Sequence, residues 1–316
     1  MNQKLLPVKR RNIFKRFVDA IQKYWPYYLM MVVPAILIFI YKVVPLYGLQ
    51  IAFKEYYPRV GILESEWVGV AHFKKFFSGA DFLRVFGNTL KINFLKILFG
   101  FPTPIILALA FNAIIGKYFQ RTMQIISYIP QFLSWVIVYS FMYMLFNYNY
   151  GALNLVFDAF GLEKVPFLAS EKWLVPMLIF SYVWKNIGWG SIVYFAALGN
   201  INSEYYEAAD IDGASKWSKL VYITLPLLLP IMTLMFLIQI GTLLYGDYEQ
   251  NLIFMGTNPL LRKKGEILET YMFNLGVGEM QYSFATAVGI FQSVFGATLV
   301  IISNFLTKRL NGYSIW

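Results

Sequence analysis

Long apolar segments alternate with short polar ones along the whole chain. Each apolar segment is about 20 residues long, which is the length that a helix needs to cross the hydrocarbon of a bilayer. The segments span residues 27–48, 88–113, 123–146, 173–198, 220–243 and 283–306. Prolines interrupt several of them, and membrane helices tolerate this when neighbouring helices satisfy the freed carbonyl groups. The pattern predicts an all-α integral membrane protein with six transmembrane helices, formed by residues 27–316 as one domain.

Composition supports the membrane assignment. Of the 316 residues, 58% are hydrophobic and 14% are charged, whereas about a quarter of the residues of a soluble domain are charged. The net charge of +10 comes from residues that flank the apolar segments, so it favours membrane topology over nucleic-acid binding. The chain has no cysteine and one histidine, His72, which excludes disulfides, thiolate metal sites and histidine clusters. We expect His72 to be an ordinary loop residue and expect no metal site.

Basic residues and helical spacing characterise residues 1–26. We interpret them as an amphipathic helix on the inner membrane face, because the apolar segment that follows is too long for a secretory signal. Six spans place both termini on one side, and the basic N-terminus indicates the cytoplasm. Residues 199–219 then also lie on the cytoplasmic side.

A polar island at residues 203–219 separates the fourth and fifth apolar segments. We expect a helix that Ser203 caps, with Glu204 and Glu207 in its first turns, where the helix dipole favours acids. Gly213 would allow a tight turn, and a second helix would begin near Ser215. Two short helices between two spans would form a knuckle in the water, shaped to fit a partner.

The island resembles the EAA loop of ABC importer permeases. That loop has the pattern E-A-A, three residues, G and a downstream I-x-L-P, with the extended form E-A-A-x-x-D-G-A. The residues that match, and that the resemblance implies couple the permease to an ATPase, are Glu207, Ala208, Ala209, Asp212, Gly213, Ala214, Trp217 and Pro226, with Ile223 and Leu225 completing the pattern. In the family this loop is a cytoplasmic coupling helix that docks in a cleft of a separate ATP-binding subunit. Glu207 would bond a basic group there. The alternative is an ordinary amphipathic helix between two spans.

The resemblance extends over nearly the whole chain. Residues 128–136 and 151–154 are similar to maltose-type carbohydrate permeases, as is the sequence Gly188-Trp189-Gly190. The branch associated with polysaccharide fragments, including pectin- and alginate-type uptake systems, is the most similar one. This implies the type I ABC importer permease fold in a bacterial inner membrane. It also implies three kinds of partner: a second, homologous permease that makes a heterodimer, two cytoplasmic ATPase subunits, and an extracellular lipid-anchored or periplasmic solute-binding protein.

No phosphate-binding loop occurs in the chain. The motif G-x-x-x-x-G-K-[ST] needs serine or threonine after Gly-Lys, and here Tyr118 follows Gly116-Lys117. We therefore expect no enzyme activity and no cofactor in this chain, with ATP and Mg²⁺ bound by the partner ATPase. Membrane lipid is the remaining expected partner, and no nucleic acid is expected.

Lysines within apolar segments point to a substrate pathway. A charge at the bilayer centre costs at least ~2.5 kcal/mol, and such residues usually face a bundle interior or a water path. The candidate pathway residues are Lys96, Trp184, Lys185, Asn186 and Trp189 within the spans, and Tyr245, Asp247 and Glu249 just beyond the fifth span. Snorkelling or an internal ion pair is the alternative for the lysines, and solvated loop charges are the alternative for the last group.

The sequence thus predicts the transmembrane subunit of an ATP-driven oligosaccharide importer. Aromatic residues make up 19% of the chain, which agrees with sugar stacking and equally with aromatic belts at membrane interfaces. An ABC permease for a non-sugar solute and an ion-coupled secondary transporter remain alternatives. A secondary transporter would be expected to have buried acids in its spans and an internal repeat, and few acids and no repeat are visible.

Overall fold

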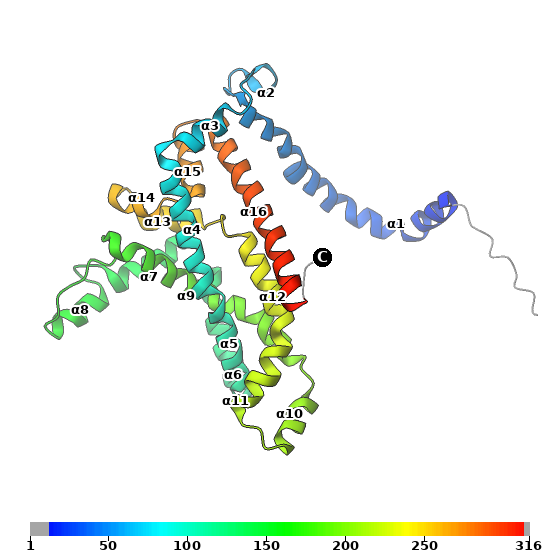
Figure 1. Cartoon of the computed structure of the whole chain (residues 1–316), viewed down its shortest axis with the longest axis vertical. Coiled ribbons are helices and arrows are strands. Elements are labelled where there is room, and N and C mark those ends of the chain that lie inside the picture. Colours follow the sequence, from blue (N-terminus) through cyan, green and yellow to red (C-terminus); the bar gives the residue numbers. More distant parts are fainter. Residues whose placement is uncertain (1–12, 313–316) are drawn as a thin grey trace, which may run out of the picture.

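Helices make up almost all of the protein, as the computed structural model of the chain shows for residues 13–312 (Figure 1). In the first half of the chain the helices are α1 (Ile13–Ile38), α2 (Gly61–Glu64), α3 (Ala71–Ser78), α4 (Ala80–Gly100), α5 (Pro102–Ala113), α6 (Lys117–Tyr128), α7 (Trp135–Phe146) and α8 (Ala152–Ala159). The second half has α9 (Glu171–Gly199), α10 (Ser203–Ile211), α11 (Lys216–Lys219), α12 (Leu225–Gly241), α13 (Tyr248–Met255), α14 (Pro259–Gly265), α15 (Leu268–Phe273) and α16 (Tyr282–Asn311). The prediction of a mainly helical protein is confirmed.

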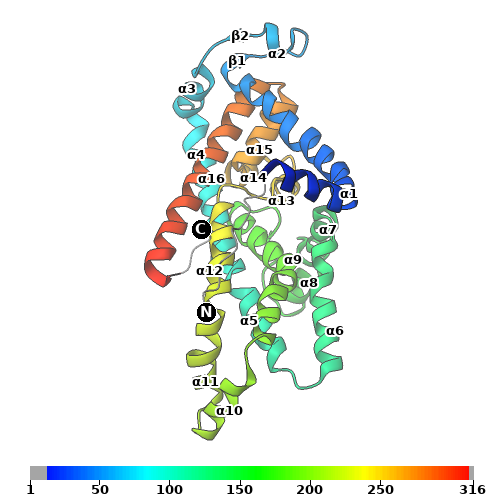
Figure 2. The same cartoon turned by 90° about the vertical axis from the view of Figure 1, so that its right-hand side faces the viewer.

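Five 3₁₀- or π-helical segments adjoin these α-helices in the described part of the chain, and one small β-hairpin lies at the end of the bundle. The segments are η1 (Phe39–Val43), η2 (Val44–Phe53), η3 (Ile129–Phe132), η4 (Leu220–Thr224) and η5 (Asn274–Gly278). Strands β1 (Lys54–Glu55) and β2 (Glu66–Trp67) pair antiparallel, with Lys54 opposite Trp67. The hairpin lies at the end of the molecule opposite α10 and α11 (Figure 2). His72 is not the loop residue that we expected: it is buried in α3, and its Nε2 donates to the Lys54 carbonyl at 3.1 Å.

Three apolar clusters hold the bundle together at different heights. One cluster joins α4, α7, α9 and α13 around Ile92, Leu178 and Phe254. A second joins α3, α4, α15 and α16, and a third joins α5, α9 and α12 at the end nearer α10. Glycine allows close approach at one crossing, because a side chain at Gly188 of α9 would collide with the Ser127 carbonyl of α6.

The first long helix stands away from this bundle (Figure 1). Every side chain from residue 21 to residue 47 is exposed, and only η2 at its end packs on α16. Residues 1–12 of the predicted basic segment 1–26 lie outside the described residues. The predicted boundary at residue 27 is not a helix end: α1 runs through it, and the backbone leaves helical geometry only at Tyr24.

The predicted spans correspond to helices, with one break. Among the described residues, four helical runs are long and apolar enough to cross a membrane: Ile21–Phe53, Ala80–Ala113, Lys216–Gly241 and Tyr282–Arg309. Residues 117–146 form a bent pair at 107°, and could count as a fifth. The bend follows from Pro130 in η3 and from the extended residues Leu133 and Ser134 before α7. The long helix α9 is not among these runs, because Lys185, Asn186 and several other polar residues lower its hydropathy.

Candidate functional site

The polar knuckle, residues 203–219, projects from one end of the bundle (Figures 1 and 2). Its first helix, α10, is capped by the residue before the one that we expected. Asn202, not Ser203, is the cap: its side-chain oxygen accepts from the Glu204 amide at 3.1 Å, and its side-chain nitrogen lies 3.0 Å from the Glu204 carboxylate. The expectation that Ser203 caps the helix is therefore wrong, and the reason is that Asn202 supplies both an acceptor and a donor.

Gly213 ends α10 in a turn that favours glycine. Its φ is +74°, in the left-handed region. The Ala214 amide donates to the Ala209 carbonyl at 2.9 Å, and the Asp212 amide donates to Ala208 at 3.1 Å. This 6→1 bond after a left-handed residue is the Schellman arrangement. No atom lies within 4 Å of a side chain built at Gly213, so the backbone conformation, and not crowding, selects glycine.

Two side-chain contacts tie α10 to the start of the next span. The Tyr206 hydroxyl lies 2.9 Å from the Thr224 hydroxyl of η4, and the Lys219 ammonium lies 2.6 Å from the Asp210 carboxylate. Ser215 caps α11 by accepting from the Ser218 amide at 3.1 Å. A continuous helical path then leads from α11 through η4 into α12. A force on α10 therefore has a direct route into the bundle.

The outer surface of the knuckle is unusually apolar for a polar segment. Ile211 is 87% exposed, Trp217 is 72% exposed and Tyr205 is 56% exposed. Glu207, Ala208, Asp212 and Pro226 are also exposed, whereas Ala209 and Ala214 are half-buried. An exposed apolar patch with a polar rim indicates an interaction surface.

A second candidate site is a small polar cavity among the spans. It measures about 50 Å³ and is lined by Asn93, Lys96, Ile97, Tyr182, Thr242, Tyr245, Gly246 and Asp247. Lys96 is 5% exposed, its ammonium has no hydrogen-bond partner in the described part of the chain, and it lies 5.2 Å from the centre of the Tyr182 ring. The predicted residues Lys96, Tyr245 and Asp247 thus come together.

Neighbouring polar groups fix the walls of this cavity. Asp247 accepts a hydrogen bond from the Trp135 indole of α7, and the Tyr245 hydroxyl donates to Ser293 of α16 at 3.0 Å. The Asn93 amide donates to the Leu243 carbonyl at 2.9 Å, and its oxygen has no partner in the residues described. Four helices therefore meet at one polar point.

Glu269 of α15 carries a charge-sensitive carboxyl near the same cavity. Burial, and secondarily the negative charge of Asp247, raises the pKa of Glu269 to about 7. Lys96 acts in the opposite direction. Glu269 therefore adds a titratable group that interacts with two residues of the cavity wall, from a helix outside the membrane-spanning runs.

Other predicted pathway residues point elsewhere. The Lys185 ammonium donates to the carbonyls of Gln131 at 2.8 Å and Leu133 at 2.5 Å, so it holds the break between α6 and α7. Trp184 packs against the apolar cluster around Leu178. On the same helix, Asn186 donates to the Tyr182 carbonyl at 2.8 Å, and Trp189 is 49% exposed beside Phe132. The last candidate, Glu249, is exposed in the first turn of α13.

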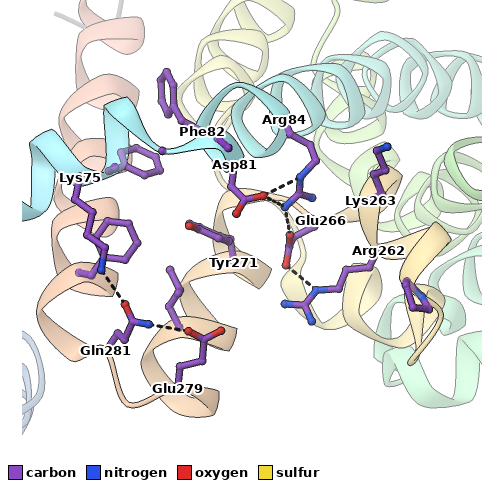
Figure 3. A pocket seen from close by; sticks show the side chains of 16 residues that line it. Lys75, Asp81, Phe82, Arg84, Arg262, Lys263, Glu266, Tyr271, Glu279 and Gln281 are labelled. Atoms are coloured by element: carbon purple, nitrogen blue, oxygen red, sulfur yellow. Dashed lines mark hydrogen bonds and ion pairs between the residues drawn. The ribbon is translucent and has the colours of Figure 1, made fainter.

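A larger pocket of about 510 Å³ opens at the end of the bundle away from the knuckle. Figure 3 shows an ion-pair chain across it, in which Arg84 contacts Asp81 at 2.6 Å and Glu266 at 2.7 Å. Arg262 contacts the same Glu266 at 3.0 Å. These pairs join α4 to the loop before α15, and so stiffen the surface formed by α3, α14 and α15.

Comparison with known proteins decides the family. Residues 100–313, which include the knuckle and the part of the cavity wall from Tyr182 to Asp247, match the family described as binding-protein-dependent transport system inner membrane component. The chain belongs to this family. Among its relatives are the protein LplB of Bacillus subtilis, 38% identical over 91% of this chain and 89% of that protein, and the polygalacturonan/rhamnogalacturonan transport system permease protein YteP of the same organism, 36% identical over 98% of this chain and 94% of that protein.

Solved structures agree with this membership. A chain of the bacterial alginate ABC transporter, in complex with an alginate pentasaccharide-bound periplasmic protein, superposes with a TM-score of 0.85 at 33% identity, over 95% of this chain and 100% of that chain. Family members are transport permease components and are not themselves catalytic. The prediction of an ABC importer permease in the membrane is confirmed.

Sequence reasoning missed several residues of both sites. In the knuckle these are Tyr205, Tyr206, Asp210, Ile211, Lys219 and Thr224, and in the cavity they are Asn93, Tyr182 and Thr242. One signal was available: Thr89, Asn93 and Lys96 recur at helical spacing within an apolar helix. The contacts of Tyr206 and Asp210 leave no such periodic signal.

Proposed function

We propose that this chain forms one half of the membrane pathway of an oligosaccharide importer, driven by separate ATP-hydrolysing subunits that bind ATP and Mg²⁺. One observation carries the proposal: a projecting two-helix knuckle presents exposed apolar side chains and is bonded directly to the start of a span. The relatives named for sugar transport support an oligosaccharide as the solute.

The proposed topology has six spans with both termini in the cytoplasm. The helices α6 and α7, with η3 between them, together make one bent span. The additional span is α9, whose 29 residues are more than the roughly 20 that a crossing needs. Lys185 satisfies the carbonyls that the bend frees, which is the condition for irregular backbone at membrane depth.

ATP would act through the knuckle as follows. The ATPase receives Glu207, Ala208 and the exposed apolar residues Ile211 and Trp217 in a cleft. When two such subunits close, they pull α10, and the bonds from Tyr206 and Asp210 carry the movement to η4 and α12. A rigid-body shift of packed helices is a known way to convert a small displacement into a change of access.

The polar cavity would be the pathway in a closed arrangement. Its volume of about 50 Å³ has room for only a few water molecules, since each needs roughly 10–15 Å³ of such space, so a sugar ring does not fit. Movement of α12 would shift residues 242–247, which follow it directly, relative to α4 and α9, and would widen the cavity between Lys96, Tyr182 and Asp247.

Two further surfaces fit the proposed partners. The exposed apolar side chains of residues 21–47 would be covered by a second, homologous permease and by lipid, which makes a heterodimer the natural assembly. The pocket with Arg84 and Glu266 would lie outside the cell, where the solute-binding protein, lipid-anchored or periplasmic, docks.

Reconstitution of the chain with its partner subunits in proteoliposomes tests the proposal. Gly213→Val should strongly reduce sugar-stimulated ATP hydrolysis, because φ at this position is +74° and a β-branched residue rarely adopts this conformation. Gly213→Asn is the matched control and should keep most of the stimulation, since Asn is one of the few other residues that tolerate this conformation. Normal stimulation in the Val variant would contradict a docking role for the knuckle.

A further inference from the structure

A large groove between α4 and α9 is used by neither site. Its volume is about 960 Å³, and its walls are mostly apolar, with Phe99 from α4 and Ile179 and Phe180 from α9. Phe99 and Phe180 are 51% and 48% exposed, so the groove is open along its length. It lies on a different side of α4 from Lys96, because Lys96 lines the polar cavity and the groove does not include it.

Three lysines gather at one end of this groove. They are Lys91 of α4, Lys172 of α9 and Lys264 of α14. Within the part of the chain that the structure describes, none of the three ammonium groups has an ion pair or a hydrogen bond. Glu171 lies at the same end, so the net charge there is about +2 by simple counting of these four groups at neutral pH.

The charged end coincides with the edge of the apolar part of the helices. After Lys91, the residues from 92 to 113 carry no charge other than Lys96. Lys172 stands in the first turn of α9, whose amide groups give that helix end a partial positive charge. Lys264 comes from α14, outside the spans. A cationic end at the membrane surface therefore continues into an apolar channel that runs toward the bilayer interior.

We propose that this groove binds an anionic phospholipid. The three ammonium groups hold the phosphate and any further acidic oxygen of the headgroup, and one acyl chain lies along Phe99, Ile179 and Phe180. In the topology proposed above this end of the groove faces the outer leaflet, where lysines attract anionic headgroups by the same electrostatics that act at the inner face. An acyl chain gains free energy from each methylene group that it buries. The inference goes beyond solute transport and does not depend on which solute is carried.

The chemistry distinguishes a lipid from the other possible occupants. An acidic oligosaccharide would use the lysines but has no group for the apolar part of the groove. An apolar helix of the partner permease would fill the groove and leave three lysines unpaired. Only an amphiphile with an anionic head satisfies both ends.

Native mass spectrometry of the delipidated, intact transporter tests the proposal with phosphatidylglycerol and phosphatidylcholine as probes. We expect phosphatidylglycerol to bind at least 10-fold more tightly, because each lysine contributes about 5-fold. The triple variant Lys91→Gln, Lys172→Gln, Lys264→Gln should lose at least 10-fold in phosphatidylglycerol affinity and leave phosphatidylcholine binding within 2-fold. The control is Lys74→Gln, Lys75→Gln, Lys263→Gln, which removes equal charge outside the groove and should change neither affinity by more than 2-fold.

A second variant tests the apolar part. Val175→Trp fills the groove and should weaken both lipids by a similar factor. The proposal is overturned by an unchanged phosphatidylglycerol affinity in the groove triple variant or in Val175→Trp. It is equally overturned by an equal loss in the control triple variant, by displacement of the lipid with trigalacturonate, or by a groove that takes lipid in the isolated chain and not in the assembled transporter.

Discussion

Loss of a single hydroxyl on α10 should uncouple ATP hydrolysis from transport. Tyr206→Phe removes the 2.9 Å hydrogen bond to Thr224 and keeps the aromatic ring. A hydrogen bond of this kind contributes about 0.5–1.5 kcal/mol, so the contact between α10 and η4 should weaken about 2- to 12-fold. The Asp210–Lys219 pair remains, but Asp210 is largely exposed, and an exposed pair contributes at most about 1 kcal/mol.

The assay is the number of sugar molecules transported per ATP hydrolysed by the intact importer in proteoliposomes. ATP hydrolysis should stay near the wild-type rate, because Ile211 and Trp217 still form the docking surface. The number of sugar molecules transported per ATP should decrease about 2- to 12-fold. Tyr205→Phe is the matched control: it makes the same chemical change one residue away, on a side chain that is 56% exposed. The reasoning would be refuted if the two variants behaved alike, or if Tyr206→Phe lost ATP hydrolysis together with transport.

Two further predictions concern the bundle itself. Lys185→Met should lower the free energy of unfolding by about 1–3 kcal/mol, seen as a lower melting temperature in detergent, because carbonyls of Gln131 and Leu133 lose their donor; Lys185→Arg should recover part of the loss, and an unchanged melting temperature in the Met variant would contradict the role. Burial raises the pKa of Glu269 to about 7 from 4.5, so the unfolded state releases this proton first and stability should fall as pH rises from 4.5 to 7. Glu269→Gln should flatten that part of the pH profile, whereas a profile with the same slope would show that another group is responsible.

Much of the fold could be predicted from the sequence because lipid imposes length. Segments of about 20 apolar residues identify spans whatever packs beside them, and the predicted segments all coincide with helices. The break between α6 and α7 could not be located in this way. It depends on Lys185, 52 residues after Leu133, which supplies the bond that makes the break stable.

The site residues could be predicted where local conformation or burial decides, and not where long-range packing decides. Gly213 could be placed at a turn because the left-handed conformation selects one residue type. Lys96 could be predicted to face a polar interior, because a charge within lipid is costly. The same argument could not predict that Lys185 contacts backbone carbonyls, since burial of a charge does not say whether a substrate, a carboxylate or a set of backbone carbonyls satisfies it. Which of these applies depends on long-range packing.

Single-cysteine cross-linking tests the central claim most directly, because the chain contains no cysteine of its own. Ile211 is the exposed last residue of α10 and Ser78 is the last residue of α3, and these two helices lie at opposite ends of the bundle (Figure 1). The two variants are Ile211→Cys and Ser78→Cys. In the intact importer a short bifunctional reagent should join the cysteine at position 211 to the ATPase subunit, and should not join the one at position 78. Labelling of position 211 by a membrane-impermeant thiol reagent added outside right-side-out vesicles, with no cross-link to the ATPase, would contradict the account.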